Sequence, residues 1–129
     1  MRLLLDTHVF LWLNSVPERL VPHLNLMRNE ETELLLSAAS AWEIAIKVGV
    51  GRLSLPQPPE RYVPARLRAI GGRSLPVEQE HALAVAALPE LHRDPFDRLL
   101  VAQSLHVDAT LVTADPAVVA YGAPTLNVG

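Results

Sequence analysis

The stretch Arg2-Leu3-Leu4-Leu5-Asp6-Thr7-His8 sets the interpretation of the rest of the chain. A short apolar run that ends in a carboxylate is typical of a buried β-strand that brings one charged group to its carboxyl end. In parallel α/β sheets, ligands bind at that edge. A structural role is also open, because Asp is a preferred helix N-cap and apolar residues follow at helical spacing from Val9 to Leu13. The stretch therefore predicts a strand and then a helix, with Asp6 as a functional acid or as a cap.

The composition limits the class of protein. A chain of 129 residues fits one domain with a proper core, and we expect that domain to span 1–129. Cysteine is absent, which excludes disulfides and thiolate chemistry and is compatible with a reducing compartment, so we expect a cytoplasmic protein. No apolar stretch approaches the roughly 20 residues that a membrane span needs, so we expect no membrane association.

The charge balance bears on the kind of partner. The formal net charge is −3, from 11 basic and 14 acidic side chains, and Lys47 is the only lysine. Such a chain has no basic surface of the kind that holds nucleic acid by phosphate neutralisation alone. Any nucleic-acid chemistry would therefore have to recruit cations.

Strand-like and helix-like segments alternate along the sequence. We expect strands at 2–5, 34–36, 75–77, 110–112 and 125–128, and helices at 7–14, 22–29, 40–48, 60–70, 78–88, from Pro95 onward, and in a short turn ending at Tyr121. This order predicts an α/β domain with a mainly parallel sheet and helices on both faces. Right-handed crossovers then bring the carboxyl ends of the strands to one edge.

Four acids fall at the end of an expected strand or in the helical turn that follows one. They are Asp6, Glu43, Asp97 and Asp115. Four unpaired carboxylates repel one another, so such a cluster persists only if a cation occupies it. Hard oxygen ligands indicate Mg²⁺ or Mn²⁺, and Thr113 would add a hydroxyl to the same shell.

Each acid also has a structural interpretation. Ser40-Ala41-Trp42-Glu43 fits a capping box, and Glu43 precedes Lys47 by four residues, a favourable spacing for a helix ion pair. Asp94 and Asp97 would both stabilise a helix N-terminus. Thr113-Ala114-Asp115-Pro116 is an ordinary turn sequence. These alternatives stay open for each acid alone.

The acids lie within four short motifs: Leu4–His8 (LLDTH), Ser37–Lys47 (SAASAWEIAIK), His92–Leu100 (HRDPFDRLL) and Thr113–Pro116 (TADP). In this order they resemble the PIN-domain family, and most closely the VapC-type toxins of prokaryotic toxin–antitoxin pairs. The resemblance covers essentially the whole chain. It implies a PIN-like three-layer α/β/α sandwich with a mainly parallel central sheet.

The resemblance also implies an activity and a partner. It implies a Mg²⁺- or Mn²⁺-dependent endoribonuclease that hydrolyses phosphodiester bonds in RNA and is inhibited by a cognate, VapB-like antitoxin. The family's acidic positions fall on Asp6, Glu43, Asp97 and Asp115. We expect Asp6 to be the central metal ligand, Asp97 and Asp115 to complete the shell, and Glu43 to act directly or through water. Whether Asp94 binds metal or only caps its helix stays open.

Other residues near the acids have weaker assignments. Arg98 and Lys47 are candidate phosphate contacts, with a helix-surface position and an ion pair as the respective structural alternatives. His8 and His92 lie beside acids in the sequence, but packing or solvent exposure is the favoured interpretation for both.

Two other functions fit part of this pattern. A haloacid-dehalogenase-like phosphatase also places an aspartate after its first strand, but it needs a second one two positions later, where His8 stands. A catalytically silent PIN-fold interaction module is the non-enzymatic alternative. We also expect a homodimer, because Val9 to Leu13 carry more apolar surface than one core face can use.

Overall fold

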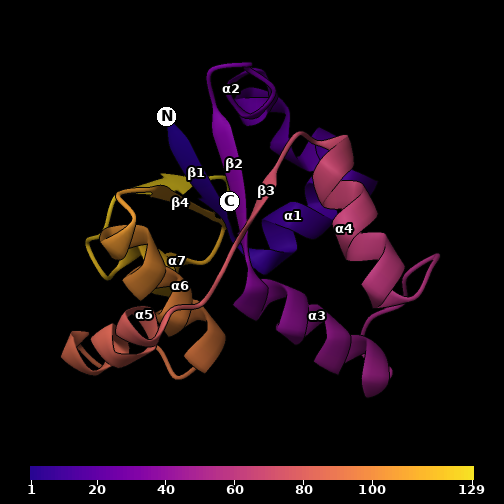
Figure 1. Cartoon of the computed structure of the whole chain (residues 1–129). Coiled ribbons are helices and arrows are strands. Elements are labelled where there is room, and N and C mark those ends of the chain that lie inside the picture. The colour runs from indigo at the N-terminus through magenta and orange to yellow at the C-terminus, as the bar shows by residue number, and fades with distance from the viewer.

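The computed structural model describes residues 1–129, and a parallel sheet of five strands lies at its centre (Figure 1). The strand order is β3-β2-β1-β4-β5. The strands are β1 (Arg2–Leu5), β2 (Glu33–Ser37), β3 (Arg73–Leu75), β4 (Thr110–Thr113) and β5 (Thr125–Asn127). All neighbouring pairs are parallel, which confirms the predicted α/β class.

The central strands are apolar at their middle positions because both sheet faces are covered there. Leu3 and Leu5 of β1 point into one hydrophobic core and Leu4 into the other, as the two-residue period of a strand requires. All three side chains are fully buried. The run that looked like a buried strand in the sequence is therefore the middle strand of a three-layer sandwich.

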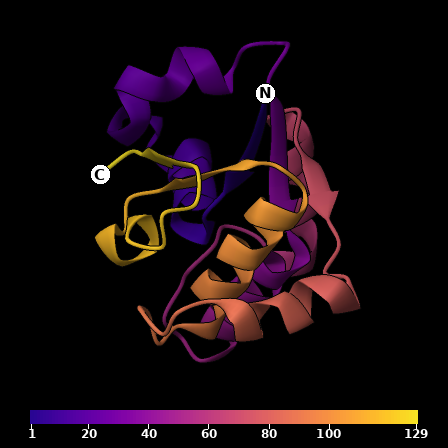
Figure 2. The same ribbon diagram turned by 90° about the vertical axis from the view of Figure 1, so that its left-hand side faces the viewer.

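The two faces carry different sets of helices (Figure 2). The larger core is covered by α1 (Thr7–Ser15), the 3₁₀ helix η1 (Pro17–His23), α2 (Leu24–Met27), α3 (Ala38–Gly49) and α4 (Pro59–Ala69). The smaller core is covered by α6 (Pro95–His106) and α7 (Pro116–Val119). The helix α5 (Gln79–Ala84) and the 3₁₀ turn η2 (Val85–Ala87) pack against α6.

The strand order places a switch point between β1 and β4. The chain winds outward from β1 to β2 and β3, then returns to β4 on the opposite side of β1. At such a point the crossovers leave in opposite directions, and the carboxyl ends of the two strands border a crevice. Asp6 follows β1 and Thr113 ends β4, so the fold brings both residues to this crevice.

Several predicted boundaries were wrong. The predicted helix 22–29 is a 3₁₀ helix from Pro17 followed by one turn of α-helix, because Pro22 lies inside the segment and has no N–H to donate. The third strand lies at Arg73–Leu75, before Pro76, and not at 75–77. The predicted helix 78–88 ends as an α-helix at Ala84 and continues as 3₁₀ to Ala87.

The start of α3 also differs from the sequence interpretation. Ser37, not Ser40, is the N-cap, and its hydroxyl accepts the N–H of Ala39 at 3.0 Å. Ser40 is instead buried within the first turn, so the capping box with Glu43 does not form. Helix α4 begins at Pro59, one residue before the expected start, and Pro64 lies inside it.

Most of the apolar surface of α1 is used within the chain. Val9, Phe10 and Leu13 are buried, and Leu11 and Trp12 pack partly against the same core. The guanidinium of Arg19 lies 4.4 Å from the centre of the Trp12 ring. The argument that this helix needs a second chain is therefore not supported. No helix combines the length and the apolar character required to cross a bilayer.

Candidate active site

Asp6 lies in the crevice between β1 and β4, and its structural role as a helix cap is confirmed. It is the N-cap of α1, since its Oδ1 accepts the N–H of His8 at 2.9 Å, and its Oδ2 accepts the hydroxyl of Thr113 at 2.9 Å. Burial is the largest single influence on the Asp6 pKa and raises it. The nearby His8 ring, the His8 amide and the Thr113 hydroxyl together outweigh burial, so the pKa lies below its ordinary value. Asp6 is a buried, ionised carboxylate.

Glu43 lies in the second turn of α3 and is 6% exposed. Its Oε1 accepts the hydroxyl of Thr7 at 2.7 Å, and its Oε2 lies 3.0 Å from Nζ of Lys47. The predicted ion pair with Lys47 is therefore present. Together the hydroxyl and the ammonium hold the buried carboxylate in one orientation.

Asp97 and Asp115 meet around the ring of His92. Nε2 of His92 lies 3.0 Å from Oδ2 of Asp97 and 3.0 Å from Oδ2 of Asp115. One ligand atom from each of the three residues lies within 4.8 Å of the other two, which no other group of three acids or histidines matches. The structure thus brings Asp97 and Asp115 within reach of a single ion. Asp6 and Glu43 are in no such triplet.

The pKa of Asp97 is raised to about 7. Burial is the main cause, followed by the negative charges of Asp6 and Asp94, and the charge of Glu43 acts in the same direction. These influences tie Asp97 electrostatically to Asp6 and Glu43. Asp6, Glu43 and Asp97 therefore influence one another at the sheet edge, and Asp115 is linked to Asp97 through their shared contact with His92.

The histidine between the acids is held by a second contact. The backbone N–H of Asp94 donates to Nδ1 of His92 at 3.2 Å, so the neutral ring carries its hydrogen on Nε2. Burial lowers the His92 pKa most, but the hydrogen bond to Asp115 and the charges of Asp97, Asp115 and Asp94 raise it above the ordinary value. In either protonation state His92 donates toward both acids.

The auxiliary residues have mostly structural contacts. Asp94 caps α6 through the N–H of Phe96 at 2.9 Å. The Thr113 hydroxyl, besides donating to Asp6, accepts the N–H of Asp115 at 3.0 Å. Arg98 donates to the carbonyl oxygens of Pro89 and Val85 and to the Tyr121 hydroxyl. The guanidinium of Arg98 thus anchors the segment before α6, and its assignment as a phosphate contact finds no support.

The donor set fits a divalent cation. Asp97 and Asp115 supply carboxylate oxygens at one point, and the raised pKa of Asp97 shows that its negative charge lacks sufficient compensation. Mg²⁺ and Mn²⁺ prefer such oxygen ligands. A cation at this point would supply the missing positive charge.

Two functional contacts were not predicted from the sequence. His92 contacts two of the acids, whereas the sequence favours packing or solvent exposure for it. Thr7 positions Glu43 from the first turn of α1. The adjacency of His92 to Asp94 and of Thr7 to Asp6 was the available signal, but neither spacing specifies a contact across the fold.

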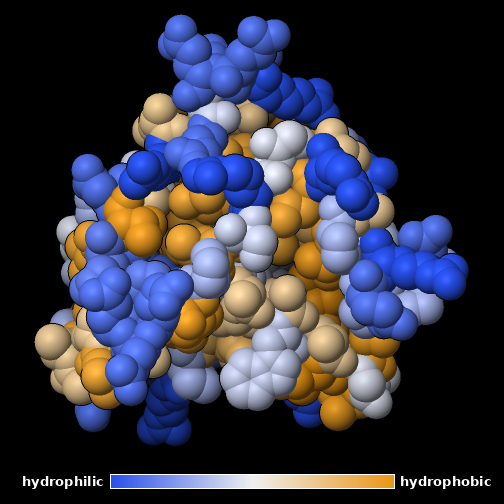
Figure 3. Space-filling model, viewed as in Figure 1, coloured by the Kyte–Doolittle hydropathy of each residue, from blue (hydrophilic) through white to orange (hydrophobic).

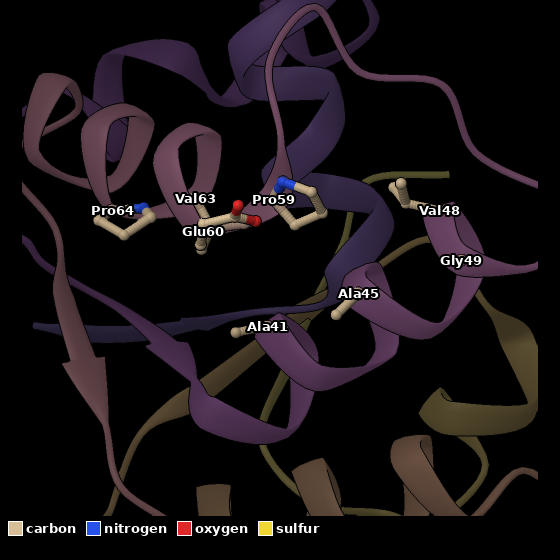
Figure 4. A pocket seen from close by; sticks show the side chains of 8 residues that line it. All are labelled: Ala41, Ala45, Val48, Gly49, Pro59, Glu60, Val63 and Pro64. Carbon is tan, nitrogen blue, oxygen red and sulfur yellow. The ribbon is translucent and has the colours of Figure 1, made fainter.

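A surface hollow that none of the four acids lines lies between α3 and α4 (Figure 4). Its volume is about 520 Å³, and small or apolar side chains such as Ala41, Ala45 and Val63 line it from both helices. Glu60 is its one titratable group. The hollow has the character of a packing surface and lacks the groups that catalysis requires.

The chain is similar to known proteins in part of its sequence and in its whole fold. A stretch of 56 residues is 45% identical to Ribonuclease VapC16 of Mycobacterium tuberculosis (strain ATCC 25618 / H37Rv), covering 43% of this chain and 40% of that protein. The fold resembles VapBC2 from Rickettsia felis, with a TM-score of 0.75, 17% identity and 98% of both chains covered. It also resembles FitAcB from Neisseria gonorrhoeae, with a TM-score of 0.64, 22% identity, and coverage of 98% of this chain and 97% of that one.

The PIN domain family model matches residues 3–123, from the first strand to the turn that precedes the last strand. This match includes all four acids and both histidines beside them. The chain belongs to the PIN-domain family.

Proposed function

We propose that the protein is a metal-dependent endoribonuclease and the toxin of a VapBC-type toxin–antitoxin pair. The observation that carries the proposal is the meeting of Asp97 and Asp115 at the sheet edge, in the electrostatic field of Asp6 and Glu43. The partial identity to a protein named ribonuclease VapC16 supports the same activity. The cytoplasm is the proposed location.

The metal is proposed to be Mg²⁺, with Mn²⁺ as the other fitting ion. Asp97 and Asp115 would hold it, with Asp6 as the central acid and Glu43 acting directly or through a water molecule. When bound, such an ion neutralises the phosphate and lowers the pKa of a coordinated water.

The chain's own residues prepare this site before any ion binds. The Thr113 hydroxyl and the His8 amide fix Asp6, while Thr7 and Lys47 fix Glu43. Carboxylates held in this way need little reorganisation when substrate arrives. Lys47 adds a cation that would attract an RNA phosphate to the buried Glu43.

The test is cleavage of single-stranded RNA with Mg²⁺ or Mn²⁺, compared with excess EDTA. Cleavage should require metal and should be lost in Asp97→Asn and Asp115→Asn. Asp108→Asn is the matched control, because Asp108 is exposed and its φ of 54° suits Asn equally well. Intact RNA under all conditions would favour the silent interaction module. A covalent aspartyl-phosphate would instead indicate the phosphatase alternative.

The proposed antitoxin needs a surface, and the hollow between α3 and α4 supplies one. Its apolar lining suits the apolar face of a partner helix, and Glu60 would suit a basic residue beside that face. Ala45 lies on its border and is exposed, so Ala45→Glu should weaken co-purification with the product of the neighbouring open reading frame. Unchanged co-purification would place the partner elsewhere.

A homodimer remains a proposal. Because α1 buries most of its apolar side chains, any dimer contact must use another surface. Light scattering that gives a mass of one chain across micromolar concentrations would exclude the dimer.

A further inference from the structure

A groove runs between α3 and the start of α6, directly beside the acids. Its volume is about 420 Å³, and Glu43 and Asp94 form part of its wall. Ile46 lines it from α3, Val50 from the residue after that helix, and Phe96 from α6. Figure 3 shows that apolar and weakly hydrophilic side chains cover the lower part of this face, over α3, with strongly hydrophilic ones above and to the sides.

Three cations border this groove. Lys47, Arg52 and Arg93 line it, although the whole chain has a net charge of −3. The side chains of Arg52 and Arg93 are exposed and make no hydrogen bond or ion pair, in contrast to Arg98. Two guanidinium groups are thus free to bind an anion within one groove. Arginine binds phosphate through a planar, bidentate contact.

An aromatic pair stands at the edge of the groove. Trp42 is 64% exposed, and its ring meets the ring of Phe96 edge to face, with 5.4 Å between the ring centres. This contact holds the indole in place while its own surface faces solvent. A fixed, exposed aromatic ring at the edge of a groove that arginines border is an arrangement on which unpaired nucleotides stack.

We propose that the groove between α3 and α6 binds single-stranded RNA next to the bond that is cut. One unpaired base stacks on Trp42, and the neighbouring phosphates bind Arg52 and Arg93. This inference rests on the proposed function, because it places the substrate of that site. It also gives an acidic protein a way to retain RNA, because three cationic side chains border the groove that Glu43 lines.

A protein partner is the competing occupant. Trp42 and Ile46 on α3 and Val50 just after it are exposed at intervals of four residues, which would also suit an apolar partner helix. The free arginines and the continuity with the acid site favour RNA, because an apolar helix would leave both guanidinium groups without anions. The experiment below separates the two.

The test measures RNA binding without cleavage. The protein carries Trp12→Phe so that Trp42 is the only tryptophan, and the probe is a mixed-sequence single-stranded RNA of twelve nucleotides in EDTA. Titration should quench the Trp42 fluorescence, and a fluorescein-labelled copy of the probe should show about a tenfold loss of affinity for Trp42→Ala. Trp42→Phe should restore most of the affinity, since the aromatic surface is kept. Leu83→Ala, at an equally exposed apolar residue on α5, is the control.

The contribution of Arg52 and Arg93 is measured separately, from the salt dependence of RNA binding. Arg93→Gln and Arg52→Gln should each reduce the slope of log affinity against log salt by about 0.7, as the loss of one single-strand phosphate contact requires. Arg68→Gln on α4 should leave the slope unchanged.

The outcomes distinguish this inference from the proposed function. If the wild-type protein cleaves RNA with metal but Trp42→Ala and Arg93→Gln bind as tightly as wild type, the groove is not the RNA site and the ribonuclease assignment stands. Quenching of Trp42 by RNA without any metal-dependent cleavage would support the groove and remove the enzyme. Quenching by the antitoxin but not by RNA would overturn the inference in favour of a protein interface.

Discussion

The Nε2 atom of His92 lies 3.0 Å from a carboxylate oxygen of Asp97. The N–H of the Asp94 backbone occupies Nδ1, so this Nε2 bears a hydrogen and acts as a donor. Because Nε2 also contacts Asp115, it donates into the space where an ion shared by the two acids would bind. His92 therefore competes with metal in this conformation, although imidazole is a common metal ligand in other sites.

His92→Ala should tighten Mg²⁺ binding. A charge-assisted hydrogen bond of roughly 1.5–3 kcal/mol would no longer compete for the carboxylates, so we expect about a tenfold lower Kd. Isothermal titration calorimetry with Mg²⁺ measures this directly, and His106→Ala serves as the control because His106 contacts only Glu80 among the acids. Weaker Mg²⁺ binding in His92→Ala would identify His92 as a ligand that reorients when the ion enters.

The metal-free protein should lose stability as pH rises from about 4 to about 7. The pKa of Asp97 is about 7 in the folded protein and 3.8 in the unfolded chain. The folded state therefore binds more protons than the unfolded state between these two values. The contribution of protonated Asp97 to the free energy of unfolding is fully present below pH 4 and is lost as the pH rises through 7. The raised pKa of His92 acts in the same direction, since its contribution is present below 6.5 and is lost as pH rises through the folded value.

Urea denaturation in EDTA at several pH values measures this slope, and Asp97→Asn should flatten it. Asp97→Asn should also be more stable than wild type at pH 8, because the buried charge is removed. A steep slope that persists in the variant would assign the linkage to another group.

Asp94→Asn and Asp97→Asn should separate a cap from a catalytic acid. Asn retains an oxygen that can accept the N–H of Phe96, so Asp94→Asn should cost less than about 1 kcal/mol of stability and leave RNA cleavage largely intact. Asp97→Asn should abolish metal-dependent cleavage. Loss of cleavage in Asp94→Asn alone, at normal stability, would reverse these roles.

Arg98→Met should destabilise the fold without changing the salt dependence of RNA binding. The variant keeps an apolar stem but loses the donors to Pro89, Val85 and Tyr121. We expect a loss of roughly 2 kcal/mol, since charged hydrogen bonds contribute about 1.5–3 kcal/mol each and are not additive. Thermal denaturation tests this, with exposed Arg68→Met as the control. Equal stability together with a reduced salt slope would restore Arg98 as a phosphate contact.

The features predicted correctly from the sequence are those that depend on local residue pattern and on strand order. Leu3 to Leu5 identified the central strand, and the parallel order then placed Asp6 and Asp115 at one edge, because parallel strands end together. Ser37 was missed as a cap because Ser40 and Glu43 matched the capping-box spacing better. Nothing in the local pattern shows that Arg98 reaches back to Pro89 or that His92 lies between two acids. These contacts depend on how the segment before α6 folds over the sheet edge.

Asp6→Asn should reveal whether Asp6 acts on the metal or only on α1. The cap can persist, since an Asn oxygen can accept the His8 N–H, but the ionised form that the fold favours is lost. The negative charge that raises the pKa of Asp97 is also removed, so we expect metal-free stability within about 1 kcal/mol of wild type and a shallower pH dependence between 4 and 7.

The metal response gives the second readout for Asp6. With millimolar affinity, ~10 mM Mg²⁺ should stabilise the wild-type protein by roughly 1.4 kcal/mol, or a few degrees in Tm. Asp6→Asn should lose most of this shift, because the site lacks one of its negative charges, whereas exposed Asp108→Asn should keep it. Calorimetry of the three proteins with and without Mg²⁺ decides the matter: an equal Mg²⁺ shift in all three would make Asp6 a helix cap and no more.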